Sequence, residues 1–148
     1  MAVTIRPLCS ADRPALLEMM RVFYASPAVL SNGSETIFQR DIDACLGESP
    51  YLEGYAFVES GELLGYAMLA KSFSTEFGKP CVWIEDIYIK ESHRGKGIGA
   101  LFFGFLKEKC RNCLLKLEVE EENAGALRFY RNQAFRILPY TEMIFENE

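Results

Sequence analysis

The chain has 148 residues, the length of one ordinary domain, and its 49% hydrophobic and 25% charged residues are typical of a globular protein, so we expect a single domain over residues 1–148. The formal net charge of −5 argues against nucleic acid as a partner, because binding to phosphates needs a basic surface. We expect no membrane partner and a cytoplasmic location, because no segment approaches the roughly 18 unbroken apolar residues of a membrane helix and the N-terminus has no signal-peptide pattern.

The five cysteines are odd in number and unevenly spaced, which disfavours the disulfide framework of a secreted domain. Cys110 and Cys113 form a C-x-x-C pair, but a structural zinc site needs about four ligands. The chain has one histidine, His93, and no second close cysteine pair. We therefore expect no metal.

The N-terminal part predicts one strand and two helices. Residues 3–8 alternate like a strand, and Ser10 is a candidate cap for the helix that follows. Pro27 and the Ser-Asn-Gly run at 31–33 end this helix. Ser34 is a candidate cap for a second amphipathic helix, which ends before residue 47.

The middle of the chain predicts a hairpin and a central strand. Residues 51–70 form two apolar runs joined by a Ser60-Gly61 turn, which is typical of a β-hairpin. We expect a loop at 71–80. Residues 81–90 are β-branched and aromatic, with two acidic residues in the middle, and predict a central strand.

The remaining expected elements, in chain order, are a helix from about residue 98, a strand at 114–120, a helix capped by Asn123 and ending near Asn132, and strands at 135–138 and 140–146. The strand–helix–strand unit at 81–120 implies a parallel crossover. We therefore predict an α/β (α+β) fold with a mixed, mostly antiparallel sheet of about seven strands and about four helices.

The turn between the central strand and the next helix is rich in glycine and positive charge, with the sequence RGKGIG at residues 94–99. Free amides at a helix start attract anions, and glycine lets a phosphate approach closely. Gly95, Gly97 and Ala100 also satisfy the dinucleotide pattern G-x-G-x-x-A. The charged lead-in KESHR and the short chain after Glu120 disfavour that second interpretation.

Two motifs in this part of the chain resemble those of the GNAT superfamily of N-acetyltransferases. Arg94, Gly97 and Gly99 match its Q/R-x-x-G-x-G/A pyrophosphate loop, and ENAGALRFYRNQAF at 122–135 resembles its Asn-x-x-Ala…Phe-Tyr…Gly-Phe segment. The expected order of strands and helices agrees along the whole chain. The chain departs from the family at Ala134, where a glycine usually follows the tyrosine helix.

The resemblance implies the GNAT-like acyl-CoA N-acyltransferase fold, with acetyl-CoA as co-substrate. The residues that it implies for binding acetyl-CoA are Ile87, Tyr88 and Ile89 along the pantetheine arm, Arg94, Gly95, Lys96, Gly97, Ile98, Gly99 and Ala100 around the pyrophosphate, and Asn123 beside the arm.

The resemblance also implies an enzyme that moves an acetyl group to a primary amine by direct transfer. Glu85 or Asp86 would be the general base and Tyr130 the general acid. Neighbouring residues of a strand point to opposite faces, so one of the two carboxylates faces the cleft unless a bulge turns both. The sequence EDIYI resembles a strand of diamine and polyamine acetyltransferases, which favours Glu85.

We expect a small-molecule amine as the acceptor, between the first two helices and the loop at 71–80. Candidate wall and charge residues there are Phe23, Tyr24, Phe73, Phe77, Glu35, Asp41 and Glu76. Two alternatives stay open, namely a protein amino group as acceptor and a non-catalytic module that senses coenzyme A. The last two expected strands offer edges for a homodimer.

Overall fold

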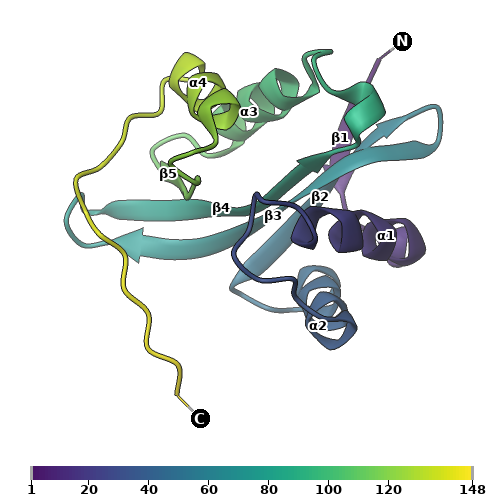
Figure 1. The fold of residues 1–148 in the computed structure, drawn as a ribbon, viewed down its shortest axis with the longest axis horizontal. Coiled ribbons are helices and arrows are strands. Elements are labelled where there is room, and N and C mark those ends of the chain that lie inside the picture. Colours follow the sequence, from purple (N-terminus) through teal and green to yellow (C-terminus); the bar gives the residue numbers. More distant parts are fainter. Residues whose placement is uncertain (1, 148) are drawn as a thin grey trace.

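The computed structural model describes residues 2–147 and is shown in Figure 1. Its elements, in chain order, are β1 (Thr4–Pro7), a 3-10 helix (Ser10–Asp12), α1 (Arg13–Tyr24), α2 (Glu35–Leu46), β2 (Leu52–Glu59), β3 (Glu62–Ser74), β4 (Lys79–Ile89), a second 3-10 helix (Glu91–His93), α3 (Ile98–Lys109), β5 (Leu114–Leu117) and α4 (Ala124–Asn132). No helix within residues 2–147 is long and apolar enough to cross a membrane.

The five strands form one sheet in the order β1-β2-β3-β4-β5. All neighbours are antiparallel except β4 and β5, which are parallel and joined through α3. Helices α1 and α2 cover one face of the sheet, and α3 and α4 cover the other (Figure 1). The predicted fold class, the parallel crossover and the four helices are thus confirmed.

Three local predictions were wrong. Ser10 does not cap α1, because it lies in the 3-10 turn that precedes the helix. Residues 71–80 are not one loop, because residues 71–74 continue the ladder with residues 79–82. The strands expected at 135–138 and 140–146 do not form, because those residues have no strand partner within the described chain.

Each face of the sheet has its own core. Leu16 and Met20 of α1 are fully buried against Tyr66 on one face, whereas Phe102 of α3 is fully buried with Phe57 on the other. Burial of one such side chain stabilises the fold by about 1.5–3 kcal/mol relative to an exposed one. The sheet is therefore a fixed platform, and its strand ends can position functional groups.

A bulge interrupts the pairing of β3 with β4. Met68 pairs with Asp86 and Leu69 with Ile84, so that Glu85 is an extra residue in β4. Beyond the bulge, Asp86 and Tyr88 point toward α1, whereas Ile84 before it packs toward α3. One extra residue therefore reverses which side chains of β4 face each core.

Candidate active site

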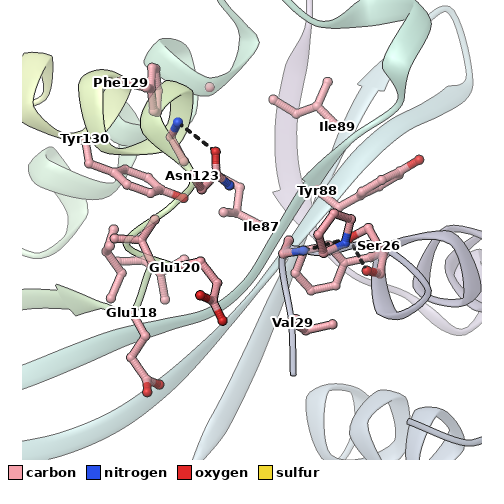
Figure 2. A pocket seen from close by; sticks show the side chains of 18 of the residues that line it. Ser26, Val29, Ile87, Tyr88, Ile89, Glu118, Glu120, Asn123, Phe129 and Tyr130 are labelled. Atoms are coloured by element: carbon pink, nitrogen blue, oxygen red, sulfur yellow. Dashed lines mark hydrogen bonds between the residues drawn. The ribbon is translucent and has the colours of Figure 1, made fainter. Parts of the chain in front are cut away.

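A cleft opens where β4 and β5 part. Their last pair is Ile84 with Leu117, and β4 continues to Ile89 without β5 beside it. The cleft has a volume of about 1900 Å³. In Figure 2, Tyr130 and Glu118 lie on one side of the cleft, opposite the segment that follows α1. Residues 85–89 thus present a strand edge that β5 leaves free.

The glycine turn closes one end of this cleft. Gly95 and Gly97 have φ values of +74° and +82°, which L residues with a side chain rarely adopt. Gly97 is the N-cap of α3, so that the amides of the first helical turn are free of intrahelical partners. Gly99 has a separate role, because a Cβ there would lie 3.0 Å from Cζ of Phe129. The turn thus offers free amides and positive potential to an anion.

The two cations of the turn differ in position. Nε of Arg94 donates to the carbonyl oxygen of Ile89 at 2.8 Å, and its guanidinium lies 5.4 Å from the centre of the Tyr88 ring. Arg94 thereby lines the cleft, whereas Lys96 lines a smaller hollow near β1. Of the cofactor residues expected from the sequence, Lys96 alone is absent from the cleft lining.

Helix α4 brings Asn123, Phe129 and Tyr130 to the opposite side of the cleft (Figure 2). The side-chain oxygen of Asn123 accepts from the amide of Ala126 at 3.2 Å, which confirms the predicted cap. Tyr130 packs edge-on against Phe103, and burial raises the pKa of its hydroxyl. That hydroxyl makes no hydrogen bond with any side chain of residues 2–147, so it is available to a ligand in the cleft.

The two neighbouring acidic residues of β4 have separate environments. Glu85 is exposed at the bulge and lines the cleft. Asp86 is 4% exposed, and its two oxygens accept from the hydroxyls of Tyr24 at 2.8 Å and Tyr66 at 2.9 Å. The bulge therefore leaves one carboxylate accessible and the other fully hydrogen-bonded.

The surroundings raise the pKa of both carboxylates. Burial raises the pKa of Asp86 to about 6, although the hydrogen bonds from Tyr24 and Tyr66 act in the opposite direction. Glu85 is exposed at the bulge, but the neighbouring chain removes enough water from its carboxylate to raise its pKa, and the charges of Asp86 and Glu142 add to this effect. A carboxylate with a raised pKa is a stronger base.

Further carboxylates gather beside Glu85 from other parts of the chain. Glu118 directly follows β5, and Glu142 comes from the C-terminal segment. A hydrogen bond with Glu142 is the largest cause that raises the pKa of Glu118, to about 7, and burial adds to it. Asp41 of α2 is half-buried, and its pKa is raised by burial and by the charge of Glu85. This end of the cleft attracts cations.

The aromatic residues expected around the acceptor divide into two groups. Phe23 and Tyr24 at the end of α1 line the cleft. Phe73 and Phe77 do not, because the longer β3–β4 hairpin carries them outward to a tip where both are exposed. The prediction that the 71–80 region helps to form the pocket was therefore wrong for these two residues.

Two of the predicted carboxylates have other partners. Glu35 forms an ion pair with Arg21 at 2.6 Å, and Glu76 accepts from the Tyr140 hydroxyl at 2.7 Å. Sequence reasoning missed the wall formed by residues 26–31, and it missed Glu118 and Glu142 as acidic groups of the cleft. Glu118 could have been found, because it follows a strand that lies parallel to β4.

Comparison with known families agrees with this geometry. The family model described as the acetyltransferase (GNAT) family matches residues 16–135, which is most of the chain. The chain belongs to the GNAT acetyltransferase family. GNAT proteins are acetyltransferases that use acetyl-CoA as co-substrate, so this protein is an acyltransferase enzyme.

The individual GNAT proteins that resemble this chain share a quarter or less of its sequence. The chain is 25% identical over 145 residues to the spermine/spermidine N(1)-acetyltransferase of Bacillus subtilis, covering 92% of this chain and 89% of the relative. A possible acetyltransferase from Clostridium difficile 630 has a TM-score of 0.83 at 17% identity, covering 100% of this chain and 99% of that one. The ribosomal-protein-alanine N-acetyltransferase of Brucella melitensis has a TM-score of 0.74 at 17% identity, covering 99% and 100%. These two structures support the GNAT fold alone.

Proposed function

We propose that the protein transfers an acetyl group from acetyl-CoA directly to a primary amine of a small, multiply charged acceptor. One observation carries the proposal. The cleft where β4 and β5 part joins a glycine turn suited to a pyrophosphate, an accessible carboxylate at Glu85 and the hydroxyl of Tyr130.

The residues of the cleft fit coenzyme A. The free amides of residues 98–100 and the guanidinium of Arg94 suit the negative charges of a pyrophosphate. The unpaired strand edge at Ile87 and Ile89 suits the amide groups of a pantetheine arm. Lys96 would act only through its backbone or through long-range charge, because its side chain lines another hollow.

Acetyl-CoA supplies an acetyl group activated as a thioester. An acceptor amine with a pKa near ~10 is mainly protonated at neutral pH and must lose a proton before it can react. Glu85 is the proposed base, acting directly or through a water molecule. Asp86 is a weaker candidate, because both of its oxygens already accept hydrogen bonds inside the fold.

Tyr130 is the proposed acid, which gives the proton of its hydroxyl to the departing thiolate. Burial raises the pKa of this hydroxyl, so that it holds its proton at neutral pH. Its accessibility from the cleft supports the same role.

Charge supports a cationic acceptor. Glu85, Glu118 and Glu142 line the same end of the cleft, and none of them is in an ion pair with a cation of residues 2–147. An acceptor with a second ammonium group would place it near Glu118 and Glu142 while its reacting amine lies near Glu85. The printed activity of the Bacillus subtilis relative agrees with a polyamine.

The test is to incubate the purified protein with acetyl-CoA and spermidine, a diamine, a monoamine of similar length or a lysine-containing peptide, while following free thiol. We expect turnover with spermidine and the diamine and a much higher KM for the monoamine. Tight binding of coenzyme A without turnover on any amine would favour a sensor. Turnover on the peptide alone would favour a protein acceptor.

Two variants test the assigned roles. Glu85→Gln and Tyr130→Phe should each lower kcat by about 100-fold or more and change the Kd for acetyl-CoA by less than about threefold. Glu62→Gln is a matched control, because Glu62 is an exposed carboxylate outside the cleft. Equal losses in kcat and in cofactor affinity would contradict the acid and base roles.

A homodimer belongs to the same proposal, because the C-terminal residues 136–147 expose large apolar side chains. The cytoplasmic location and the absence of a nucleic acid partner stay predictions from the sequence.

A further inference from the structure

Asp86 is a buried carboxylate with no cation beside it. It is 4% exposed, and no Lys or Arg within residues 2–147 forms an ion pair with it. Asp12, the other buried carboxylate of these residues, pairs with Arg6 instead. An unpaired carboxylate is costly to bury, and the raised pKa of Asp86 indicates that the hydrogen bonds from Tyr24 and Tyr66 offset only part of this cost. Such a group is a candidate for a role other than stability.

The bond from Tyr24 links the acceptor side of the cleft to the sheet. Tyr24 is the last residue of α1, and no backbone hydrogen bond joins residues 13–34 to a strand within residues 2–147. The other side-chain hydrogen bonds of residues 13–34 stay within this region or go to α2. Within the described chain, the 2.8 Å bond to Asp86 is therefore the one hydrogen bond from this region to the sheet.

Tyr66 makes the same kind of bond, but its position is already determined by the sheet. It lies in β3 and pairs with Tyr88 in the ladder, and Met68 of the same strand pairs with Asp86. Backbone pairing thus holds β3 against β4 without the Tyr66 hydroxyl. Tyr66 is fully buried and does not line the cleft. The two hydroxyls on one carboxylate therefore differ in what they can position.

One wall of the cleft begins two residues after Tyr24. Residues 26–31 line the cleft, and in Figure 2 Ser26 and Val29 lie across it from Tyr130. We call residues 26–31 the acceptor wall. The hydroxyl of Ser26 donates to a carbonyl oxygen in the last turn of α1 at 2.6 Å, so the wall continues directly from that turn. A displacement of Tyr24 would therefore displace the start of the wall.

The far end of the acceptor wall returns to the same ring. Gly33 follows the wall with a φ of +64°, and a Cβ there would lie 2.6 Å from Cε1 of Phe38 and 3.5 Å from Cδ1 of Tyr24. The ring centres of Tyr24 and Phe38 are 5.2 Å apart. The wall thus starts from Tyr24 and ends against it, and the hydroxyl of Tyr24 is bonded to Asp86.

We propose that Asp86 is a positioning residue, which acts through Tyr24 to hold the acceptor wall at a fixed distance from Glu85. Glu85 and Asp86 are neighbours at the bulge of β4, so the proposed base and the wall share one support. A carboxylate suits this place because it accepts from two hydroxyls at once. The effect on the acceptor rests on the proposed function, whereas the link between Asp86 and the wall does not.

Two variants that each remove one hydroxyl test this link. Tyr24→Phe and Tyr66→Phe keep the ring and take one hydrogen bond from the same carboxylate, so each is the matched control of the other. The readout is hydrogen exchange in the free protein at the amides of Ala25 and Ser26, which bond to carbonyls of α1. We expect exchange about tenfold faster or more in Tyr24→Phe, and a change of less than about threefold in Tyr66→Phe. An equal change in both variants, or none in Tyr24→Phe, would overturn the proposal.

Kinetics measure the effect on the acceptor. We expect Tyr24→Phe to raise the KM for spermidine by about fivefold to tenfold, with kcat and the Kd for acetyl-CoA within about twofold of the wild type. Tyr66→Phe should leave all three within about twofold.

Each other combination of results contradicts part of the proposal. A higher KM without faster exchange would mean that the Tyr24 hydroxyl contacts the acceptor itself, which overturns the positioning role. Faster exchange with an unchanged KM would overturn the effect on the acceptor. If no amine is acetylated, the proposed function fails, and the exchange experiment still decides whether Asp86 holds the acceptor wall.

Discussion

Asp86→Asn should remove part of the pH dependence of the protein's stability. Burial raises the pKa of Asp86 to about 6 in the folded protein, compared with about 3.9 in an unfolded chain. The folded protein therefore holds this proton more tightly. Its contribution to stability is fully present below about pH 4 and is lost as the pH rises through about 6, which corresponds to about 3 kcal/mol at pH 7.

The amide of the variant cannot ionise, so it avoids this loss, although it cannot accept from both Tyr24 and Tyr66 as the carboxylate does. That second effect is independent of pH. The difference in unfolding free energy, variant minus wild type, should therefore increase by about 2–3 kcal/mol between pH 4 and pH 7, whatever its starting value.

Urea unfolding followed by the fluorescence of Trp83, the single tryptophan, measures this difference at each pH. Asp12→Asn is a matched control, because Asp12 is the other buried carboxylate of residues 2–147 and Arg6 lowers its pKa. For Asp12→Asn, the unfolding free energy of the variant minus that of the wild type should become more negative as the pH rises. A difference for Asp86→Asn that stays constant within 1 kcal/mol would refute the reasoning.

Three further predictions follow from single positions. Ala134 has a φ of +72° at the end of α4, so Ala134→Gly should raise the melting temperature by about 2–4 °C in a thermal scan, and a lower value would contradict the assigned strain. A Cβ at Gly65 would lie 2.3 Å from the carbonyl oxygen of Tyr88, so Gly65→Ala should lower the unfolding free energy by about 2–3 kcal/mol in urea. Gly61 has a positive φ and no atom near its Cβ position, so Gly61→Ala measures the cost of backbone strain without a clash. The kcat of the wild type should increase with pH through the raised pKa of Glu85, and a Glu85→Gln variant that keeps the same increase would exclude Glu85 as the base.

The parts of the site that depend on local sequence were predictable. The glycine turn, the Ser34 and Asn123 caps and the amphipathic helices each need only residues within a few positions of one another. The strand-to-helix turn at residues 94–99 was recognised for the same reason. Its shape depends on a backbone conformation that glycine permits locally.

The parts that depend on contacts between distant segments were not predictable. Nothing near Asp86 in the sequence indicates that Tyr24 and Tyr66 enclose it, and the bulge that gives Glu85 and Asp86 different surroundings depends on the pairing with β3. The C-terminal strands were expected from composition, but a strand also needs a neighbour to pair with, and residues 135–146 have none within the described chain. Glu142 belongs to the C-terminal segment outside the sheet, and only the folded chain brings it to the cleft.

The extra residue in β4 shifts the alternation of its side chains by one position. Val82 and Ile84 before the bulge, and Ile87 and Ile89 after it, pack on the side of α3, whereas Tyr88 packs on the side of α1 and α2. Deletion of Glu85 would therefore turn every later side chain of β4 to the opposite face. The cleft thus depends on the length of β4 as well as on the side chains that it carries.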